Sequence, residues 1–252
     1  GYTGLHRQME GAFLEWSDPR RERPRAFRRD ANRLTIYLDG INQRLHRLDR
    51  IFAIGAIDKY RAGHFHHLAD DRSIREVILS GGDPLMIPDG RLEQLISQID
   101  SIRHVERIRI HTRMPIVLPS RINSDLLSLL TRTHSQVLVV VHANHGQEIA
   151  GDCVSALRRL VNSGLPVLNQ AVLLSRINDS LDALEALSTS LINCGVIPYY
   201  LHQLDRVTGT AHFEVNVDRG RQLIEDLRAR LPGYAVPHLV QEIPGRRSKT
   251  PL

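Results

Sequence analysis

Two glycines and an aspartate follow a short apolar run in the stretch Ser80-Gly81-Gly82-Asp83-Pro84-Leu85. The run before them holds β-branched residues and a helical pattern begins near Leu92, which is typical of a strand, a glycine turn and a helix. Glycines let the backbone approach a ligand closely, and the free N–H groups of such a turn can hold an anionic group. Asp83 adds a carboxylate at the carboxyl end of a strand, where α/β proteins bind ligands. An ordinary turn with a capping aspartate explains the same residues.

Lysine is nearly absent from this chain. Only Lys59 and Lys249 occur, and the other 31 of the 33 basic residues are arginine. Lysine forms Schiff bases with carbonyl groups and arginine does not. Because arginine supplies the surface charge of this chain, we do not expect a lysine to be present for charge alone. Lys249 lies in the stretch 244–251, PGRRSKTP, which is typical of a tail that folds over a site. A solvated lysine near the end of the chain is the alternative.

Further polar side chains lie where strands are expected to end. They are Asp83, His111, Arg113, His142, Asn144, His145, Asn169, Gln170, His202, Asp205 and Glu242. The carboxyl ends of parallel strands meet at one edge, so these residues would surround a single site. Each of them alone is equally well explained as the cap of a strand or a helix.

Strand and helix patterns alternate from Ile74 onward. Expected strands cover residues 76–80, 107–111, 136–142, 166–174, 197–203 and 238–243, and expected helices cover 91–102, 124–132, 147–163, 181–193 and 218–230. Gly164 and Gly195 are expected to end two of these helices. The alternation predicts βα units and an α/β fold with a parallel sheet.

The first quarter of the chain lacks this regularity. Residues 1–66 carry 13 Lys+Arg against 8 Asp+Glu, whereas residues 67–252 are balanced, so we expect a basic N-terminal segment before an α/β domain at 67–252. A solvated arm explains the basic run Arg20–Arg29 better than nucleic-acid binding does. Leu45, Leu48, Ile51 and Phe52 have helical spacing. His64, His66 and His67 lack a cysteine or carboxylate pattern, so we expect a wet loop and no metal there.

Composition excludes several classes of protein. No run approaches the roughly 18 apolar residues of a membrane span. No signal peptide is visible, and two cysteines fit a reducing cytoplasm better than a disulfide framework. The chain opens at Gly1 without a methionine, as expected of a fragment.

Five spaced stretches together resemble one family. They are SGGDPL, RIHTRMPIVLPSRI (Arg109–Ile122), LNQAVLLSRIND (Leu168–Asp179), PYYLHQLDRVTGTAHF (Pro198–Phe213) and GYAVPHLVQEIPGRRSKTPL (Gly233–Leu252). In this order they resemble the lysine 2,3-aminomutase family of radical S-adenosylmethionine enzymes, and above all its short bacterial branch that acts with elongation factor P. The resemblance covers roughly 70% of the chain, from about Ile74 to the last residue.

The resemblance implies an incomplete (β/α)6-type parallel barrel and an isomerase that moves the α-amino group of L-lysine to the β-carbon. It implies three cofactors, which are pyridoxal 5′-phosphate, S-adenosylmethionine and a [4Fe–4S] cluster. Lysine, free or attached to a protein, is the implied substrate, and the elongation factor P pathway is the implied partner.

The resemblance also assigns roles to residues of this chain. Lys249 matches the lysine that holds pyridoxal 5′-phosphate covalently. Asp205 and Glu242 match two carboxylates that hold the amino groups of the substrate lysine; the short branch has glutamate where free-lysine enzymes commonly have aspartate. The residues matched to the S-adenosylmethionine site are Ser80, Gly81, Gly82 and Asp83 at its methionine end, with Gln170 and the stretch His142–His145 as further expected contacts.

One family feature is missing. The family carries a Cys-x3-Cys-x2-Cys loop some forty residues before SGGDPL, whose three thiolates bind the cluster and leave one iron open. Residues 1–66 contain no cysteine, and Cys153 and Cys194 are 41 residues apart (194 − 153) in expected helices. The aromatic and arginine residues that follow the family's loop are not recognisable either. We therefore expect no metal ligands and no radical activity from this chain as written.

Three interpretations of this gap stay open. The first quarter of an aminomutase has diverged, or the chain is a cluster-free protein that binds lysine or pyridoxal 5′-phosphate, or it is the product of a frame-shifted gene. A Cys-x3-Cys-x2-Cys motif in another reading frame upstream of Ile74 would favour the frameshift.

Overall fold

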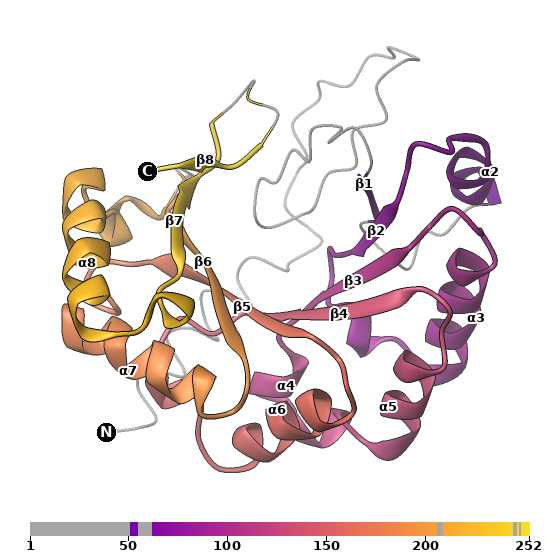
Figure 1. Cartoon of the computed structure of the whole chain (residues 1–252), viewed down its shortest axis with the longest axis horizontal. Coiled ribbons are helices and arrows are strands. Elements are labelled where there is room, and N and C mark those ends of the chain that lie inside the picture. The colour runs from indigo at the N-terminus through magenta and orange to yellow at the C-terminus, as the bar shows by residue number, and fades with distance from the viewer. Residues whose placement is uncertain (1–50, 55–61, 206–208, 244–245, 247) are drawn as a thin grey trace. The chain divides into compact units, whose positions relative to one another are not determined.

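The computed structural model describes residues 51–54, 62–205, 209–243, 246 and 248–252. The chain divides into two compact units, residues 1–35 and 36–252, and every described residue belongs to the second. The helices of this unit lie along one face of its sheet (Figure 1). None of the helices in the described ranges is both long and apolar enough to cross a membrane.

The sheet has eight strands in the described part of the chain, and their order in space follows their order in sequence. The strands are β1 (Ile51–Ile54), β2 (Glu76–Leu79), β3 (Arg107–Thr112), β4 (Gln136–Val141), β5 (Val167–Leu173), β6 (Ile197–Gln203), β7 (His238–Gln241) and β8 (Thr250–Pro251). Strands β1 to β7 run parallel, and β8 returns antiparallel to β7. The sheet curls into an open half-barrel (Figure 1), so the predicted incomplete parallel α/β barrel is confirmed.

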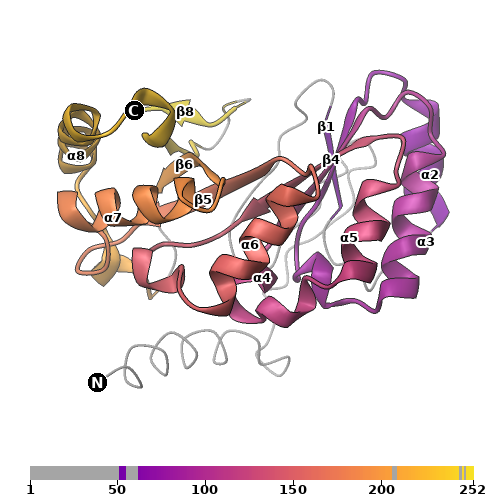
Figure 2. The ribbon, with the colours of Figure 1, turned by 60° about the horizontal axis from the view of Figure 1, so that its bottom comes forward.

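Helices connect the parallel strands, as a crossover connection requires. They are α2 (Ala62–Asp70), α3 (Asp89–Asp100), α4 (Met114–Val117), α5 (Ser124–Thr131), α6 (Asp152–Asn162), α7 (Leu181–Ile192) and α8 (Val217–Arg230). Short 3₁₀ turns lie in the connections at Pro84–Met86 (η2), Pro119–Arg121 (η3), Gly146–Glu148 (η4), Ala211–Phe213 (η5) and Gly233–Ala235 (η6). Figure 2 shows α3, α5, α6 and α7 side by side in front of the sheet.

The core lies between the sheet and this layer of helices. In β4, Val137, Val139 and Val141 are buried members of the core, while the alternate residues face the opposite side of the sheet. Leu157 and Leu160 on α6 are fully buried members of the same cluster. The face of the sheet that the helices do not cover therefore carries the alternate side chains of the strands.

Three predictions about local structure were wrong. Ile51 and Phe52 lie in β1, paired with β2, and not in a helix. His66 lies on α2, so the histidine group is helical and not a loop, although the side chains of His64 and His67 lie outside the described residues. The helix expected from residue 147 begins only at Asp152, because Gly151 has φ +54° and breaks the helical path.

The two expected helix-ending glycines are confirmed by their backbone angles. Gly164 has φ +86° after α6, and Gly195 has φ +79° after α7. A Cβ at Gly164 would meet nothing within 4 Å, whereas a Cβ at Gly195 would lie 2.8 Å from Cγ1 of Val161. The two sites therefore share a backbone requirement and differ in steric room.

This difference predicts unequal costs for the same substitution. Gly164→Ala should lower the free energy of unfolding by about 1 kcal/mol, the usual cost of a left-handed L-residue. Gly195→Ala should cost roughly 1 to 3 kcal/mol more, since the added methyl overpacks the contact with Val161. Urea denaturation of both variants measures the two losses. Equal losses would show that Val161 moves aside without penalty.

Candidate functional site

Strand alternation presents polar side chains on the face of the sheet opposite the helices, here called the inner face. In β3, Ile108 and Ile110 belong to the core, so Arg109 and His111 point the other way. The strand register carries this pattern across the sheet, with Gln170 of β5 opposite Tyr200 of β6. The same alternation places His142, Gln170, Tyr200, His202 and Glu242 on the inner face.

Lys249 reaches the inner face from the C-terminal hairpin. In the β7–β8 pair Gln241 lies opposite Thr250, so the register carries Lys249 to the side of Glu242. The Nζ atom of Lys249 lies 3.4 Å from Oε1 of Glu242, and both side chains are only 20% exposed. The structure thus brings together two residues that the sequence assigned to one site.

The amine of Lys249 also has an imidazole and an aromatic ring beside it. Its Nζ lies 3.0 Å from Nε2 of His202 and 5.0 Å from the centroid of the Tyr200 ring, within cation–π range. Burial lowers the pKa of Lys249, against the opposing effect of Glu242. Burial also lowers the pKa of His202 to about 3, so its imidazole is neutral, and in the tautomer protonated at Nδ1 its Nε2 accepts a hydrogen bond from Nζ.

Asp205 and Glu242 form an acidic pair beside this amine. Burial, together with the charge of Glu242, raises the pKa of Asp205 to about 6, while the charge of Lys249 opposes this rise. Above that pKa the two carboxylates and one ammonium carry a net charge of −1. The group therefore attracts an additional cation.

His111 on β3 and His142, which directly follows β4, form a second group on the inner face. The rings of His111 and His142 meet edge to face with centroids 5.5 Å apart. Burial lowers the pKa of His111 well below its ordinary value and that of His142 to about 4, so both are neutral at pH 7. Among the described residues, Nε2 of each imidazole and Nε2 of Gln170 are buried without a hydrogen-bond partner. Unpaired buried nitrogens on one face are expected contacts for a bound molecule.

The buried imidazoles predict that stability falls on acidification. His111, His142 and His202 have depressed pKa values in the folded chain, so their contribution is present above about 6.5 and is lost as the pH falls toward 4. The raised pKa of Asp205 acts in the opposite sense between about 4 and 6 and offsets part of one histidine. His142 alone should contribute roughly 2–3 kcal/mol of this loss.

Thermal unfolding between pH 7 and pH 4 measures the effect. His142→Gln should flatten the dependence of the midpoint on pH, while His212→Gln, at an exposed histidine of η5, should leave it unchanged. An unaltered slope in His142→Gln would mean that this imidazole is charged in the folded state.

The stretch SGGDPL forms the loop after β2, as predicted. Gly81 and Gly82 have φ +88° and +55°, which only glycine adopts readily. Asp83 caps η2, since its Oδ1 accepts the N–H of Leu85 at 3.0 Å. The same carboxylate ties this loop to the end of β3, where it accepts Oγ1–H of Thr112 at 2.7 Å and the N–H of Arg113 at 2.6 Å. Its contribution to a site is therefore to shape the loop.

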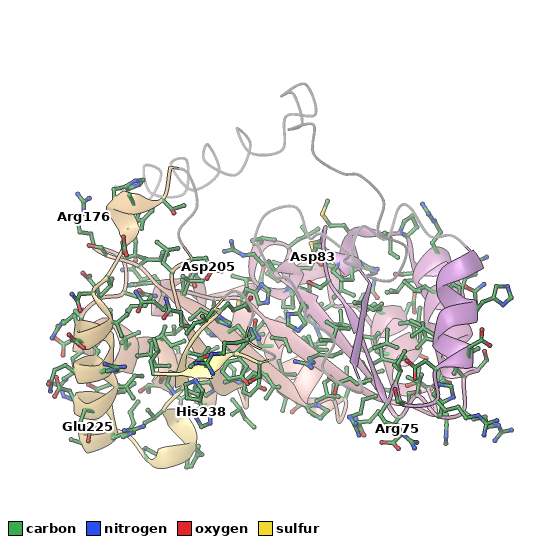
Figure 3. The ribbon with its side chains drawn as sticks, turned by 90° about the horizontal axis from the view of Figure 1, so that it is seen from above. Arg75, Asp83, Arg176, Asp205, Glu225 and His238 are labelled. Atoms are coloured by element: carbon green, nitrogen blue, oxygen red, sulfur yellow. The ribbon has the colours of Figure 1, made fainter. Side chains whose placement is uncertain are left out.

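Asp83 and Asp205 lie at the same edge of the sheet, although more than a hundred residues separate them in sequence. Figure 3 shows both at the upper edge, whereas Arg75 and His238, which precede and begin strands, lie at the lower edge. The predicted meeting of the strand ends is therefore found.

Polar side chains brace the loops along this edge. The guanidinium of Arg113 donates to Glu148 at 3.2 Å, and the other oxygen of Glu148 accepts the N–H groups of Asn144 and His145 at 2.7 and 2.8 Å. Oδ1 of Asn144 in turn accepts the N–H of Val172 at 2.8 Å. These bonds link the loops after β3 and β4 to β5, so Arg113, Asn144 and His145 hold the rim in shape.

Two buried asparagines complete this bracing. Asn169 exchanges two hydrogen bonds with the backbone of Ala143, at 2.9 and 3.1 Å. Asn178 is fully buried and donates to the carbonyls of Asn144 and Val172 while it accepts from Leu174. Sequence reasoning missed Asn178 and Glu148, since neither follows a strand directly.

Sequence reasoning also missed two pairs on the inner face. Arg109 donates to Oε1 of Glu76 at 2.7 Å through Nε, and the two side chains are 16% and 13% exposed. The hydroxyls of Tyr199 and Tyr200 lie 2.9 Å apart. The alternating run RIRIHT could have predicted the pair at Arg109, because it places arginines on one face of a strand whose other face is apolar.

The cysteines lie away from the inner face. Cys153 is on α6 and Cys194 follows α7, and both are buried in the helix layer. Burial raises the pKa of Cys153 to about 11 and also raises that of Cys194, so both thiols stay protonated. In the described ranges no three His, Cys, Asp or Glu side chains are arranged to hold a metal ion. The donor set of an iron–sulfur cluster is not found there.

Comparison with known proteins finds relatives that share one name. No protein-family profile matches it. Over 186 residues it is 45% identical to the L-lysine 2,3-aminomutase of Escherichia coli (strain K12), which covers 74% of this chain and 54% of the relative. The L-lysine 2,3-aminomutase of Methanococcus maripaludis is 41% identical over 74% of this chain and 43% of its own length. The chain thus spans about half the length of the curated relatives it matches.

A solved structure shares the fold. Streptococcus suis SuiB bound to S-adenosylmethionine superposes with a TM-score of 0.51 at 12% identity, over 71% of this chain and 42% of SuiB. The curled parallel sheet seen here is therefore an arrangement found in crystal structures. In sequence, the matched part of the chain is therefore similar to L-lysine 2,3-aminomutases over about half of their length.

Proposed function

We propose that this chain carries the pyridoxal 5′-phosphate and lysine site of a lysine 2,3-aminomutase of the elongation factor P branch. The observation that carries the proposal is the position of Lys249, whose Nζ lies on the inner face between His202 and Glu242, with Asp205 beside them. The amine of Lys249 therefore lies next to an acidic pair, Asp205 and Glu242, that can bind a cation.

The residues around Lys249 fit pyridoxal 5′-phosphate. Condensation with a carbonyl needs an unprotonated amine, and burial moves the pKa of Lys249 in that direction. The unpaired Nε2 atoms of His111 and His142 are available to polar groups of the cofactor or the substrate. Once bound, the cofactor supplies a conjugated ring that stabilises electron density at the carbon next to the amine. This chain supplies the amine and holds it in place.

Asp205 and Glu242 are proposed to hold the ammonium groups of the substrate. Lysine brings two positive charges, and the described groups Asp205, Glu242 and Lys249 together carry a charge of −1 when both carboxylates are ionised and Lys249 is protonated. Charge-assisted hydrogen bonds to such carboxylates are the strong kind. Glu242 in place of aspartate is the feature that favours the elongation factor P branch.

The loop of Ser80, Gly81, Gly82 and Asp83 and the side chain of Gln170 are proposed to border S-adenosylmethionine. The positive φ angles of both glycines leave their backbone open to a close approach, and Nε2 of Gln170 is buried without a partner among the described residues. Asp83 acts by fixing the loop, because its carboxylate already accepts three hydrogen bonds.

The residues of this chain do not fit a [4Fe–4S] cluster, because two buried, protonated cysteines cannot replace three thiolates of one loop. We propose that the chain as written generates no radical. The alternative function is therefore a cluster-free protein that binds lysine or pyridoxal 5′-phosphate, favoured by the cofactor-side residues that remain together. A frame-shifted gene is the remaining explanation of the first quarter.

Removing one carboxylate tests the substrate assignment. Asp205→Asn should weaken the binding of L-lysine by about 1.5–3 kcal/mol, the scale of a hydrogen bond to a charged group. Calorimetry with L-lysine measures the loss, and Asp125→Asn, an exposed carboxylate in the first turn of α5, is the matched control. Unchanged affinity in Asp205→Asn would remove Asp205 from the site.

A further inference from the structure

The amine of Lys249 lies beside Glu242 and Asp205, where the proposed function places an ammonium group of the substrate. Its Nζ lies 3.4 Å from Oε1 of Glu242, and the charge of Glu242 also bears on the neighbouring Asp205. A carboxylate pair that is to receive the amino group of a substrate is thus already facing an amine of its own chain.

The groups around Nζ are those that recognise any primary ammonium. An ammonium has three N–H donors. Oε1 of Glu242 at 3.4 Å is an acceptor, and Nε2 of His202 at 3.0 Å is one in the tautomer protonated at Nδ1. The face of Tyr200 lies 5.0 Å away. None of these contacts depends on the rest of the Lys249 side chain, so an ammonium of another molecule would meet the same acceptors.

The contact between Lys249 and Glu242 is also longer than a well-formed hydrogen bond between charged groups. The separation of 3.4 Å exceeds the roughly 2.7–2.9 Å of a well-formed N–H···O bond between charged groups. Without the Lys249 charge, Asp205 and Glu242 would be two partly buried carboxylates that lack the ammonium which the described part of the chain places beside them, and this loss is unfavourable. Loss of the internal ammonium should therefore strengthen the attraction for an external one.

We propose that Lys249 is the internal occupant of an ammonium subsite made by Glu242, Asp205 and His202, so that Nζ and an external primary ammonium compete for it. The competition couples two events. Any change that takes Nζ out of the subsite opens it to a second ammonium, and a second ammonium displaces Nζ. This rests on the proposed role of Asp205 and Glu242 in holding a substrate ammonium.

Calorimetry with 1,5-diaminopentane tests the competition. Lys249→Met should bind this diamine at least tenfold more tightly than the wild-type chain, because the internal competitor is gone. Lys249→Arg keeps a cation in the subsite and should stay within about twofold of wild type. The double substitution Lys249→Met with Glu242→Gln should lose the gain. Equal or weaker binding by folded Lys249→Met overturns the proposal, and absence of diamine binding to every form overturns the proposed substrate site with it.

A second measurement needs no change at Lys249. In a Lys59→Arg chain Lys249 is the single lysine, so labelling with ¹⁵N-lysine gives one Nζ resonance. Saturating unlabelled 1,5-diaminopentane should move that resonance to the position of a solvent-exposed lysine. Binding that leaves the Nζ resonance unmoved would show that the diamine does not displace Lys249.

Discussion

Replacing Lys249 by arginine should abolish covalent uptake of pyridoxal 5′-phosphate, whereas replacing Lys59 by arginine should leave it intact. Arginine preserves the positive charge beside Glu242 but cannot condense with a carbonyl group. Lys249 and Lys59 are the two lysines of the chain, so the pair of variants assigns the site without further scanning. The expected change is from stoichiometric labelling to background.

Borohydride reduction followed by peptide mapping gives the readout. The reduced cofactor should appear on the peptide that contains Lys249 in the wild-type chain and in Lys59→Arg, and on no peptide in Lys249→Arg. Retained thermal stability in Lys249→Arg shows that the loss is chemical and not a loss of folding. Label found on Lys59 alone would overturn the assignment of Lys249.

The environment of Lys249 also predicts how this labelling depends on pH. Burial lowers the pKa of the amine, with Glu242 opposing the effect, so the unprotonated form becomes available below the ordinary range of a lysine. A buried amine between a neutral imidazole and two carboxylates is the kind of lysine that reacts selectively. A rate of uptake that rises at lower pH than that of a model lysine peptide is the expected signature.

The fold was predictable because parallel strands covered on one face by helices leave a strong pattern. The run QVLVVVH combines β-branched residues with the length of a strand, and it forms β4. The glycines at 164 and 195 marked helix ends by the conformation they permit. β1 was missed because its four residues, IFAI, continue the apolar spacing of a helix and gain a strand partner only through β2. Pairing between distant segments overrides local spacing in such a case.

Which residues gather on the inner face was predictable from the sequence, but the contacts between them were not. Motif matches named Lys249, Asp205 and Glu242, and strand ends named His111, His142 and His202. The contact between Lys249 and His202 depends on the antiparallel pairing of β8 with β7. No local sequence pattern predicts this pairing. The pairing of Arg109 with Glu76 likewise depends on the register between β2 and β3. Roles that arise from register could not be read from spacing alone.

Asp83 shows a different limit. The glycine turn suggested either a ligand contact or an ordinary cap, and the structure shows capping of η2 together with a tie to Thr112 and Arg113. A carboxylate at a strand end is equally suited to both tasks, since backbone N–H groups and ligands meet there. Only the neighbouring strand decides which partner the oxygens take.

Anaerobic reconstitution of this chain with iron and sulfide should yield no stoichiometric [4Fe–4S] cluster. Such a cluster needs about three thiolates in one loop. The chain has two cysteines in all, and burial keeps Cys153 and Cys194 protonated in the helix layer, away from the inner face. No 5′-deoxyadenosine should form with S-adenosylmethionine, dithionite and lysine.

Two comparisons make this expectation sharp. The Escherichia coli L-lysine 2,3-aminomutase is treated in parallel for comparison, and a Cys153→Ser/Cys194→Ser chain sets the level of adventitious iron. The wild-type chain should match the double variant. A cluster in the wild-type chain above that level would show that Cys153 or Cys194 binds iron after all. 5′-Deoxyadenosine formed by both chains would show that other side chains hold the iron. If neither the cluster nor 5′-deoxyadenosine forms while Lys249 still takes up pyridoxal 5′-phosphate, the chain is best explained as a cluster-free binding protein. If the purified chain does not fold, it is best explained as the product of a frame-shifted gene.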